Sequence, residues 1–291
     1  MVKKKLSLLG GDKREIVVAN ALIKAGYDIK VFGLPKEKLR DNKVYCSSVS
    51  QAVKDADVVI LPVRGLDEKG VLYAPFITKE IIITQDDFNN TAPSAEIFVG
   101  VASPYLKELG ESANIKILQV MELDPIAVPN AIPTAEGALA MAIEKSPLTI
   151  DNSKVLILGF GRVAKATAKV FQALGARIFI CSRNPEEIAA AKEKGYDVRR
   201  YNGLTRILPH AHVVINTVPA LVLKDEILAY TSPDVLIIDL ASIPGGVDFA
   251  AAKRRDINAI HALGLPGKCA PITAGKILAK GLIHLLETER S

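Results

Sequence analysis

Residues 154–183 hold the residue types and spacing that most clearly indicate a chemistry. The apolar run Val155–Leu158 leads into Gly159-Phe160-Gly161-Arg162-Val163-Ala164, then a helical pattern, and then the apolar run Ala176–Cys181. Dinucleotide-binding units have this order: the glycines permit a tight turn and close approach to a pyrophosphate, and the small third residue packs helix on sheet. The N–H groups at the helix start would bind phosphate. We therefore predict a nucleotide site that includes Gly159, Gly161, Arg162 and Val163; the alternative is a tight turn in a nucleotide-free α/β domain.

The residues after the second strand bear on which cofactor binds. Sites that prefer NAD usually carry an acid about 20 residues after the glycines, where it bonds the ribose 2′-hydroxyl. Here the strand ends in Cys181-Ser182-Arg183-Asn184, and no acid appears before Glu186. Arg183 could pair bidentately with a 2′-phosphate, and Ser182 could donate to it. The sequence therefore favours NADP, with NAD as the second possibility; the competing interpretation of Arg183 is a plain surface charge.

Composition sets limits on the class of protein. The chain has 291 residues, 49% hydrophobic and 24% charged, which suits two globular domains. Its net charge of +5 is modest, it has three widely spaced cysteines, and no apolar run reaches membrane-spanning length. The N-terminal stretch lacks the apolar core of a signal peptide. We expect a cytoplasmic protein that binds neither nucleic acid nor membrane and has no metal site.

Apolar runs separated by helical stretches predict the fold class. We expect an α/β protein with two Rossmann-like, doubly wound parallel-sheet domains, joined by two crossing helices with a cleft between them. The expected strands are Leu6–Leu9, Ile29–Phe32, Val58–Leu61, Ile81–Thr84, Ile97–Val99, Ile115–Leu118, Val155–Leu158, Arg177–Cys181, Asp197–Arg199, Val213–Asn216, Val235–Asp239 and Asn258–Ala262.

Residues 122–133 contain three prolines and predict a domain boundary. We expect a helix after Pro133, with Thr134 as its N-cap, ending near 143–145. A last helix over about residues 274–287 is expected to pack back on the first domain. The predicted domains are residues 1–132 with 273–291, for substrate or partner, and residues 133–272, for NAD(P). The first turn, Leu9–Glu15, is glycine-rich but lacks the full fingerprint, so the first domain is expected to bind no dinucleotide.

Ligands of doubly wound sheets bind beyond the carboxyl ends of the strands. In the second domain we expect Thr217, Val218 and Pro219 to line the nicotinamide side, with Leu240 beside them. In the first domain Arg14 and Arg64 are candidates to hold carboxylates, and Asp12 is a candidate acid or base. Helix capping or a surface ion pair would explain each of these residues taken alone equally well.

One class of dehydrogenase fits poorly. The D-2-hydroxy-acid dehydrogenases share this layout and carry Arg before Gly in the loop that corresponds to Ser242–Asp248. This loop reads Ser242-Ile243-Pro244-Gly245-Gly246, without Arg, and that family's paired acid and His have no clear match. A simple 2-hydroxy-acid dehydrogenase is therefore disfavoured.

Taken together, the loops closely resemble the family of the dipicolinate synthase A chain over nearly the whole sequence. The segments that carry the resemblance are Gly10-Gly11-Asp12 with Arg14, Leu61-Pro62-Val63, Ile132–Gly137, Leu158–Arg162, Phe171–Ala176, Asn216–Pro219, Leu240–Phe249, Gly264–Gly267, Ala270-Pro271 and Thr273-Ala274-Gly275. As a set these motifs are specific, whereas the glycine fingerprint alone is not.

The resemblance implies oxidation of dihydrodipicolinate, or of its hydrated 4-hydroxy-tetrahydro form, to dipicolinate during sporulation, in the mother cell. It also implies a second, flavoprotein-like partner (the synthase's B chain), and we expect a homo-oligomer as well. Forming the aromatic ring removes a hydride, which a nicotinamide accepts, and a positioned acid and base help. The candidates to bind the substrate are Gly11, Arg14, Pro244, Gly245, Gly246 and Gly267. The candidates for proton transfer are Asp12, Thr134, Glu136 and Ser242.

Two other classes of function stay open. One is a different NAD(P)-dependent dehydrogenase with the layout of alanine dehydrogenase or adenosylhomocysteinase. The other is a non-catalytic component that binds NADP and serves its partner as scaffold or sensor.

Overall fold

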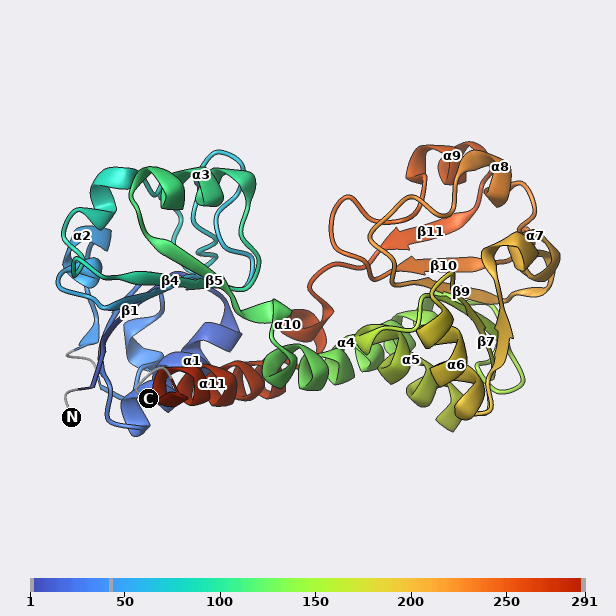
Figure 1. Ribbon diagram of the computed structural model, residues 1–291, viewed down its shortest axis with the longest axis horizontal. Coiled ribbons are helices and arrows are strands. Elements are labelled where there is room, and N and C mark those ends of the chain that lie inside the picture. The colour runs from blue at the N-terminus through green and yellow to red at the C-terminus, as the bar shows by residue number, and fades with distance from the viewer. Residues whose placement is uncertain (1–2, 42–43, 289–291) are drawn as a thin grey trace. The chain divides into compact units, whose positions relative to one another are not determined.

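The protein divides into two compact units, each built on its own parallel sheet (Figure 1). The computed structural model describes residues 3–41 and 44–288. Residues 1–129 with 271–291 form the first unit, and residues 130–270 form the second. The second unit is thus one continuous stretch, whereas the first is assembled from both ends of the chain.

The first unit is a five-stranded parallel sheet with the order β2-β1-β3-β4-β5. Helices α1 and α11 cover one face, and α2 and α3 cover the other (Figure 1). The strands are β1 (Lys5–Leu9), β2 (Asp28–Phe32), β3 (Val58–Ile60), β4 (Glu96–Val99) and β5 (Lys116–Gln119), and the helices are α1 (Lys13–Lys24), α2 (Val49–Val53), α3 (Pro104–Ser112) and α11 (Pro271–Thr288), with 3-10 turns η1 (Lys36–Lys38), η3 (Gln85–Phe88) and η4 (Val120–Glu122).

Both faces of this sheet are buried, which explains why its strands are nearly continuous apolar runs. Leu8 lies opposite Val31 on β2 and Ile60 on β3, and packs in one core with Leu278 and Leu282 of α11. The neighbouring Leu9 points to the other core, where it joins residues of α2 and α3. The terminal helix α11 is therefore part of the hydrophobic core of the first unit.

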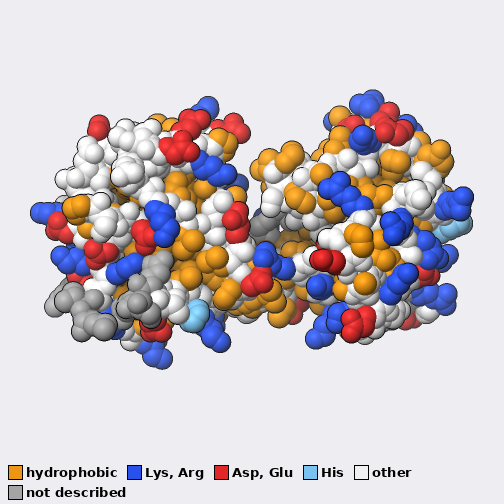
Figure 2. All heavy atoms as spheres, in the orientation of Figure 1, with side chains coloured by type: hydrophobic (Ala, Val, Ile, Leu, Met, Phe, Trp, Pro, Cys, Tyr) orange, Lys and Arg blue, Asp and Glu red, His pale blue; other side chains and the backbone are white. Residues whose placement is uncertain are grey.

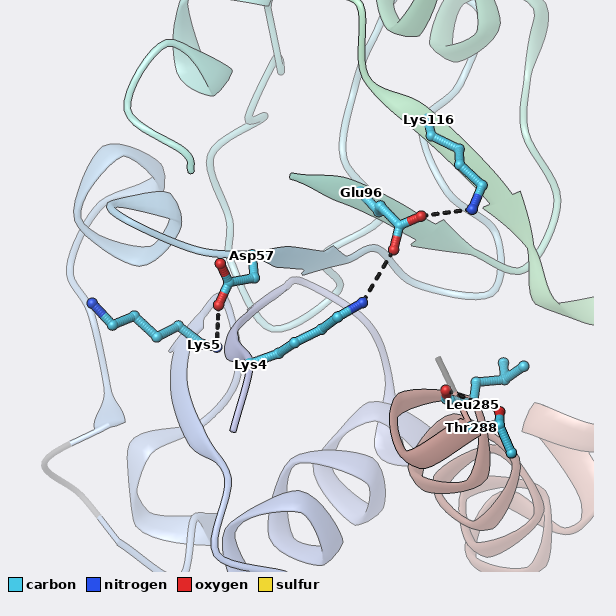
Figure 3. A network of polar contacts seen from close by, with 7 residues as sticks. All are labelled: Lys4, Lys5, Asp57, Glu96, Lys116, Leu285 and Thr288. Atoms are coloured by element: carbon cyan, nitrogen blue, oxygen red, sulfur yellow. Dashed lines mark hydrogen bonds and ion pairs between the residues drawn. The ribbon is translucent and has the colours of Figure 1, made fainter. Parts of the chain in front are cut away.

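A network of polar contacts links neighbouring strands at the amino-terminal edge of the first sheet (Figure 3). Glu96, at the start of β4, pairs with Lys4 at 3.3 Å and with Lys116 of β5 at 2.7 Å. The backbone N–H of Lys5 donates to Asp57 at 2.7 Å. Burial opposes ionisation of Glu96, but the hydrogen bonds from the two lysines outweigh it and lower its pKa. These charges join strands at the edge opposite the ligand-binding edge, so we assign them a structural role.

The second unit is a six-stranded parallel sheet with the order β11-β10-β9-β6-β7-β8, the doubly wound order of dinucleotide-binding domains. Helices α4, α5 and α6 contribute to the core on one face, and α7, α8 and α9 to that on the other (Figure 1). The strands are β6 (Lys154–Leu158), β7 (Arg177–Cys181), β8 (Asp197–Arg199), β9 (Val213–Asn216), β10 (Leu236–Asp239) and β11 (Asn258–His261), and the helices are α4 (Asp124–Lys145), α5 (Arg162–Ala173), α6 (Pro185–Glu193), α7 (Leu204–Ile207), α8 (Asp225–Leu228), α9 (Phe249–Arg254) and α10 (Leu265–Cys269), with η5 (Tyr201–Gly203) and η6 (Leu208–His210).

All but one of the expected strands are present, with ends that differ by at most one residue. The exception is Ile81–Thr84, which is wrong as a strand. It lies in the long connection after β3, where Ile82 forms an isolated antiparallel bridge with Val71 and the N–H of Leu72 donates to the carbonyl of Ile81 at 2.8 Å. This short apolar run covers the sheet without joining it.

The expected start of a helix at Thr134 is also wrong. α4 begins at Asp124, ten residues earlier, and includes Pro125, Pro129 and Pro133. Pro125 stands in the first turn, where a missing N–H has no cost, and the three prolines recur every four residues on one side of the helix. Thr134 is therefore inside the helix, and its hydroxyl donates to the carbonyl of Asn130 at 3.0 Å.

Within the described residues, α4 is long and apolar enough to cross a membrane by length and composition alone. Buried helices of globular domains pass the same test, and Ala135, Ala138 and Ala142 of α4 are fully buried in the protein. On the face seen in Figure 2, basic and acidic side chains are interspersed over each unit.

Candidate functional site

The glycine turn after β6 leaves the start of α5 open. Gly161 is the N-cap of α5, no side chain caps this end, and its first turn holds no acidic residue. A Cβ added to Gly161 would meet no atom within 4 Å. Gly159 has a φ of +83°, and a Cβ there would lie 2.9 Å from Thr217 Oγ1. Open space before the positive end of a helix is what a pyrophosphate requires, so these residues fit the phosphates of a dinucleotide.

The corresponding turn of the first unit is closed by the protein's own carboxylates. Asp12 caps α1 by accepting from the N–H of Arg14 at 2.9 Å, and Glu15 accepts from the N–H of Asp12 at 2.7 Å. The N–H of Gly11 donates to the carbonyl of Tyr73 at 2.8 Å. Two carboxylates at a helix start repel a phosphate, which supports the expectation that the first unit binds no dinucleotide.

The end of β7 is organised by Glu187 of α6, which the sequence did not single out. Its Oε2 accepts from the hydroxyl of Ser182 at 2.6 Å and from the N–H of Phe160, in the glycine turn, at 2.9 Å. Ser182 is only 2% exposed. The hydroxyl proton of Ser182 is thus donated to Glu187, and a hydrogen bond from Ser182 to a 2′-phosphate stays a prediction. Arg183 is exposed and makes no ion pair with any described residue.

A buried carboxylate fixes the loops after β9 and β10. Asp239 is fully buried and accepts from the Asn216 side chain at 2.7 Å, from the N–H of Ala241 at 3.0 Å and from the N–H of Gly246 at 2.7 Å. Asn216 in turn exchanges hydrogen bonds with the backbone of Val218. A Cβ on Gly245 would lie 2.7 Å from Asp239, so the loop requires glycine there. Buried charges are stable where donors surround them, and here those donors set the shape of the cofactor edge.

In the first unit, Arg14 and Asp12 form a bidentate pair beside Glu15. Arg14 Nε and Nη2 donate to the two oxygens of Asp12 at 3.0 and 2.9 Å. Burial opposes ionisation of Asp12, but the hydrogen bonds from Arg14 outweigh it and lower the pKa of Asp12. Glu15 also accepts from the N–H of Val63 at 3.2 Å, and its burial raises its pKa to about 7. The pKa of the buried Glu15 is thus raised, whereas that of its neighbour Asp12 is lowered.

Comparison with known proteins identifies the family. The sequence is 35% identical to the A chain of dipicolinate synthase from Bacillus subtilis over 283 residues, which covers 97% of this chain and 95% of that protein. The protein belongs to the family of the dipicolinate synthase A chain. The crystal structure of the Bacillus halodurans A chain is 33% identical with a TM-score of 0.90, covering 98% of each chain. The Bacillus subtilis A chain is 32% identical with a TM-score of 0.89, covering 99% of this chain and 98% of that one.

Family models match each unit separately. The N-terminal domain of the dipicolinate synthase A chain matches residues 5–121, and the D-isomer specific 2-hydroxyacid dehydrogenase NAD-binding domain matches residues 135–241. The second match ends just before Ser242, where this family member lacks the Arg of the 2-hydroxy-acid dehydrogenases. The second unit is therefore an NAD(P)-binding Rossmann domain whose cofactor part resembles those enzymes and whose following loop does not.

Most of the groups expected to hold a substrate carboxylate are already used within this protein. Arg14 is 4% exposed and engaged by Asp12. The N–H groups of Gly11, Gly245, Gly246 and Gly267 donate to Tyr73 O, Ser242 O, Asp239 Oδ2 and Gly264 O, respectively. A ligand would have to replace these internal hydrogen bonds, and the five assignments stay predictions. Pro244 lies exposed on the loop after β10 and stays a prediction.

The four residues expected to transfer protons differ in their exposure and in their hydrogen bonds. Asp12 is bound by Arg14, and the hydroxyl of Thr134 donates within α4; their roles in proton transfer stay predictions. Glu136, on α4, and Ser242, after β10, are exposed and stay predictions. No group of three metal-ligating side chains occurs in the described ranges 3–41 and 44–288.

The expected cofactor residues of this family member lie at the carboxyl ends of β6, β7, β9 and β10. The hydroxyl of Thr217 donates to the carbonyl of Leu158 at 2.7 Å, and the N–H of Leu240 donates to the carbonyl of Asn216 at 2.8 Å. Both bonds join neighbouring strand ends, and the cofactor contacts of Thr217 and Leu240 stay predictions. Arg162 and Val163 open α5, and Val218 and Pro219 follow β9; their contacts with a cofactor stay predictions.

Proposed function

We propose that this chain oxidises dihydrodipicolinate, or its hydrated 4-hydroxy-tetrahydro form, to dipicolinate with NADP as the electron acceptor. The observation that carries the proposal is the open glycine turn at Gly161 in a member of a family named for dipicolinate synthesis. Exposed Arg183, which has no ion pair among the described residues, is the group that would hold the 2′-phosphate.

The chemistry requires removal of two electrons and two protons from the ring. When bound, NADP supplies the acceptor for a hydride, and the second proton leaves to a base; the hydrated form also loses water. The residues of this chain that we assign to proton movement are Ser242 and Glu136, because their side chains are exposed. The Asp239 network holds the backbone around Ser242 in one shape.

The relatives are named as one component of a synthase with more than one kind of chain, which implies a partner. We propose that the partner is the synthase's flavoprotein-like B chain, that the protein also forms a homo-oligomer, and that it acts in the cytoplasm of the mother cell of a sporulating bacterium. These assignments follow from the family resemblance.

The test is dipicolinate formation from freshly generated 4-hydroxy-tetrahydrodipicolinate with NADP, while NADPH absorbance is followed, with and without the flavoprotein-like partner. We expect NADPH to appear in step with dipicolinate. Dipicolinate without NADPH would move the redox step to a flavin or to oxygen and contradict the proposal. NADP binding without turnover, even with the partner present, would instead make this protein a non-catalytic component.

A further inference from the structure

In doubly wound sheets, ligands bind at the point where the strand order reverses, and the sheet of the first unit has such a point. In a sheet with the order β2-β1-β3-β4-β5 this point lies between β1 and β3, at their carboxyl ends. The segments there are Gly10–Asp12, after β1, and Leu61–Gly65, after β3. Because Asp12 and Glu15 close the helix start to phosphate, an anion at this position needs a different partner.

Arg64 is placed to be that partner. Its guanidinium carbon lies 4.7 Å from the centroid of the Tyr73 ring, and Arg64 is exposed. A guanidinium that lies over an aromatic ring is attracted by the ring and can still donate N–H groups to an acceptor. Arg64 makes no ion pair with any residue of the described ranges.

Backbone hydrogen bonds hold Tyr73 and the residue next to Arg64 in place. The carbonyl of Tyr73 accepts from the N–H of Gly11 at 2.8 Å, and the N–H of Tyr73 donates to the carbonyl of Gly65 at 3.3 Å. Gly65 has a φ of +62°, and a Cβ there would lie 2.9 Å from the carbonyl of Val101. The residue after Arg64 is thus fixed between the β3–β4 connection and the end of β4, which holds the backbone of the loop that carries Arg64.

The two arginines that follow β1 and β3 therefore differ in kind. Arg14 is buried and gives two N–H groups to Asp12, whereas Arg64 is exposed and held only by a ring. We propose that Arg64, held over the ring of Tyr73, binds one carboxylate of the cyclic dicarboxylate substrate. This inference rests on the proposed function; Arg14 is then a positioning residue that holds Asp12 and the turn after β1.

The test is calorimetric binding of two probes, pyridine-2,6-dicarboxylate and pyridine-2-carboxylate, to the full chain in metal-free buffer. For wild type we expect the dicarboxylate to bind more tightly. Arg64→Ala should weaken dicarboxylate binding about tenfold or more, the effect of losing a charged hydrogen bond, and should change monocarboxylate binding much less. Arg64→Lys should recover only part of the loss, because an ammonium lacks the planar fork. Tyr73→Phe should bind like wild type, and Tyr73→Leu should not.

Arg40→Ala, which removes another exposed arginine of the first unit, is the matched control and should bind both probes like wild type. If wild type binds the dicarboxylate and Arg64→Ala binds it equally well, the role of Arg64 is overturned while the proposed function stands. Equal losses for both probes would still support it, since Arg64 would then bind the carboxylate that both probes carry. No dicarboxylate binding by wild type would overturn the proposed function together with this inference.

Discussion

At the scale of single residues, we expect Arg183 to decide which nicotinamide cofactor the second unit prefers. Ser182 beside it is committed to Glu187, so the exposed guanidinium is the group left for a 2′-phosphate. Arg183→Ala should weaken NADP binding about tenfold or more and leave NAD binding nearly unchanged. Titration of both nucleotides by fluorescence checks this. Arg177→Ala is the control, because Arg177 is exposed at the opposite end of the same strand. A parallel loss for both nucleotides would show that Arg183 does not read the phosphate.

A second residue-scale effect concerns Glu15 and pH. Burial raises the pKa of Glu15 from 4.5 to about 7, so the folded state holds more protons than the unfolded state between these values. Stability linked to Glu15 is therefore full below pH 4.5 and is lost as the pH rises towards 7, by roughly 3 kcal/mol. The pKa of Asp12 is lowered from 3.8, so Asp12 titrates below this pH range.

Urea unfolding of wild type and Glu15→Gln at pH 5 and pH 8 measures this effect. The difference in unfolding free energy should shift in favour of Glu15→Gln at the higher pH, because glutamine carries no buried charge. Glu108→Gln, at an exposed position of α3, should follow wild type at both values. If the difference in unfolding free energy between Glu15→Gln and wild type were the same at both pH values, Glu15 would not titrate in this range.

At the scale of elements, we expect the two glycines of the turn before α5 to differ in role: Gly159 matters for stability, and Gly161 matters for nucleotide binding. Gly159 has a φ of +83° and little room for a Cβ, whereas Gly161 has a φ of −76° and open space. Gly159→Ala should lower the unfolding free energy by about 1–2 kcal/mol or more. Gly161→Ala should leave stability nearly unchanged and weaken NADP binding about tenfold, because its methyl group enters the space of the pyrophosphate. Thermal unfolding and nucleotide titration of both variants give the comparison; unchanged NADP binding by Gly161→Ala would place the phosphates elsewhere.

Helix α11 makes a comparable close approach to α1. A Cβ on Gly275 would lie 2.7 Å from the Cβ of Val17 and 2.8 Å from the carbonyl of Arg14. Gly275→Ala should destabilise the first unit by about 1–3 kcal/mol through overpacking, despite the better helix propensity of alanine of about 1 kcal/mol. Lys280→Ala, at an exposed position of α11, should have little effect. Urea unfolding checks both, and a more stable Gly275→Ala would mean that α1 and α11 can separate at low cost.

The sequence predicted the elements that local residue patterns determine, and it missed features that depend on tertiary contacts. The strands of both sheets were predicted because parallel strands buried on two faces are short apolar runs between breakers. The start of α4 was missed because prolines normally break helices, and the packing that keeps Pro129 and Pro133 helical is tertiary. Asp239 reaches Asn216 across strands, and no local pattern shows which N–H groups such contacts already use. The sequence therefore could not show that the N–H groups of the predicted substrate-binding glycines are engaged within the protein, whereas the open turn at Gly161 fits a phosphate.

At the scale of the whole molecule, the two units differ in how the chain forms them: one is a continuous stretch and the other combines both ends of the chain. The second unit is the continuous stretch 130–270, with its own sheet and two hydrophobic cores. The first unit needs residues 271–291, because Leu278, Leu282 and Leu286 of α11 are buried in the core that holds Leu6 and Leu8 of β1. Cofactor binding and the candidate carboxylate anchor at Arg64 thus belong to parts of the chain with different folding requirements.

This inequality predicts how fragments behave. Residues 130–270 expressed alone should fold and bind NADP nearly as tightly as the full chain, because the glycine turn, Glu187, Arg183 and the Asp239 network all lie inside that stretch. Residues 1–129 alone should expose the apolar face of β1 and α1 and aggregate. The same fragment joined by a flexible linker to residues 271–291 should recover a cooperative transition, since α11 restores the buried leucines. Circular dichroism and calorimetry of the three fragments measure this. A cooperative transition for residues 1–129 alone would show that α11 is dispensable, and loss of NADP binding by residues 130–270 would show that the cofactor site depends on the first unit.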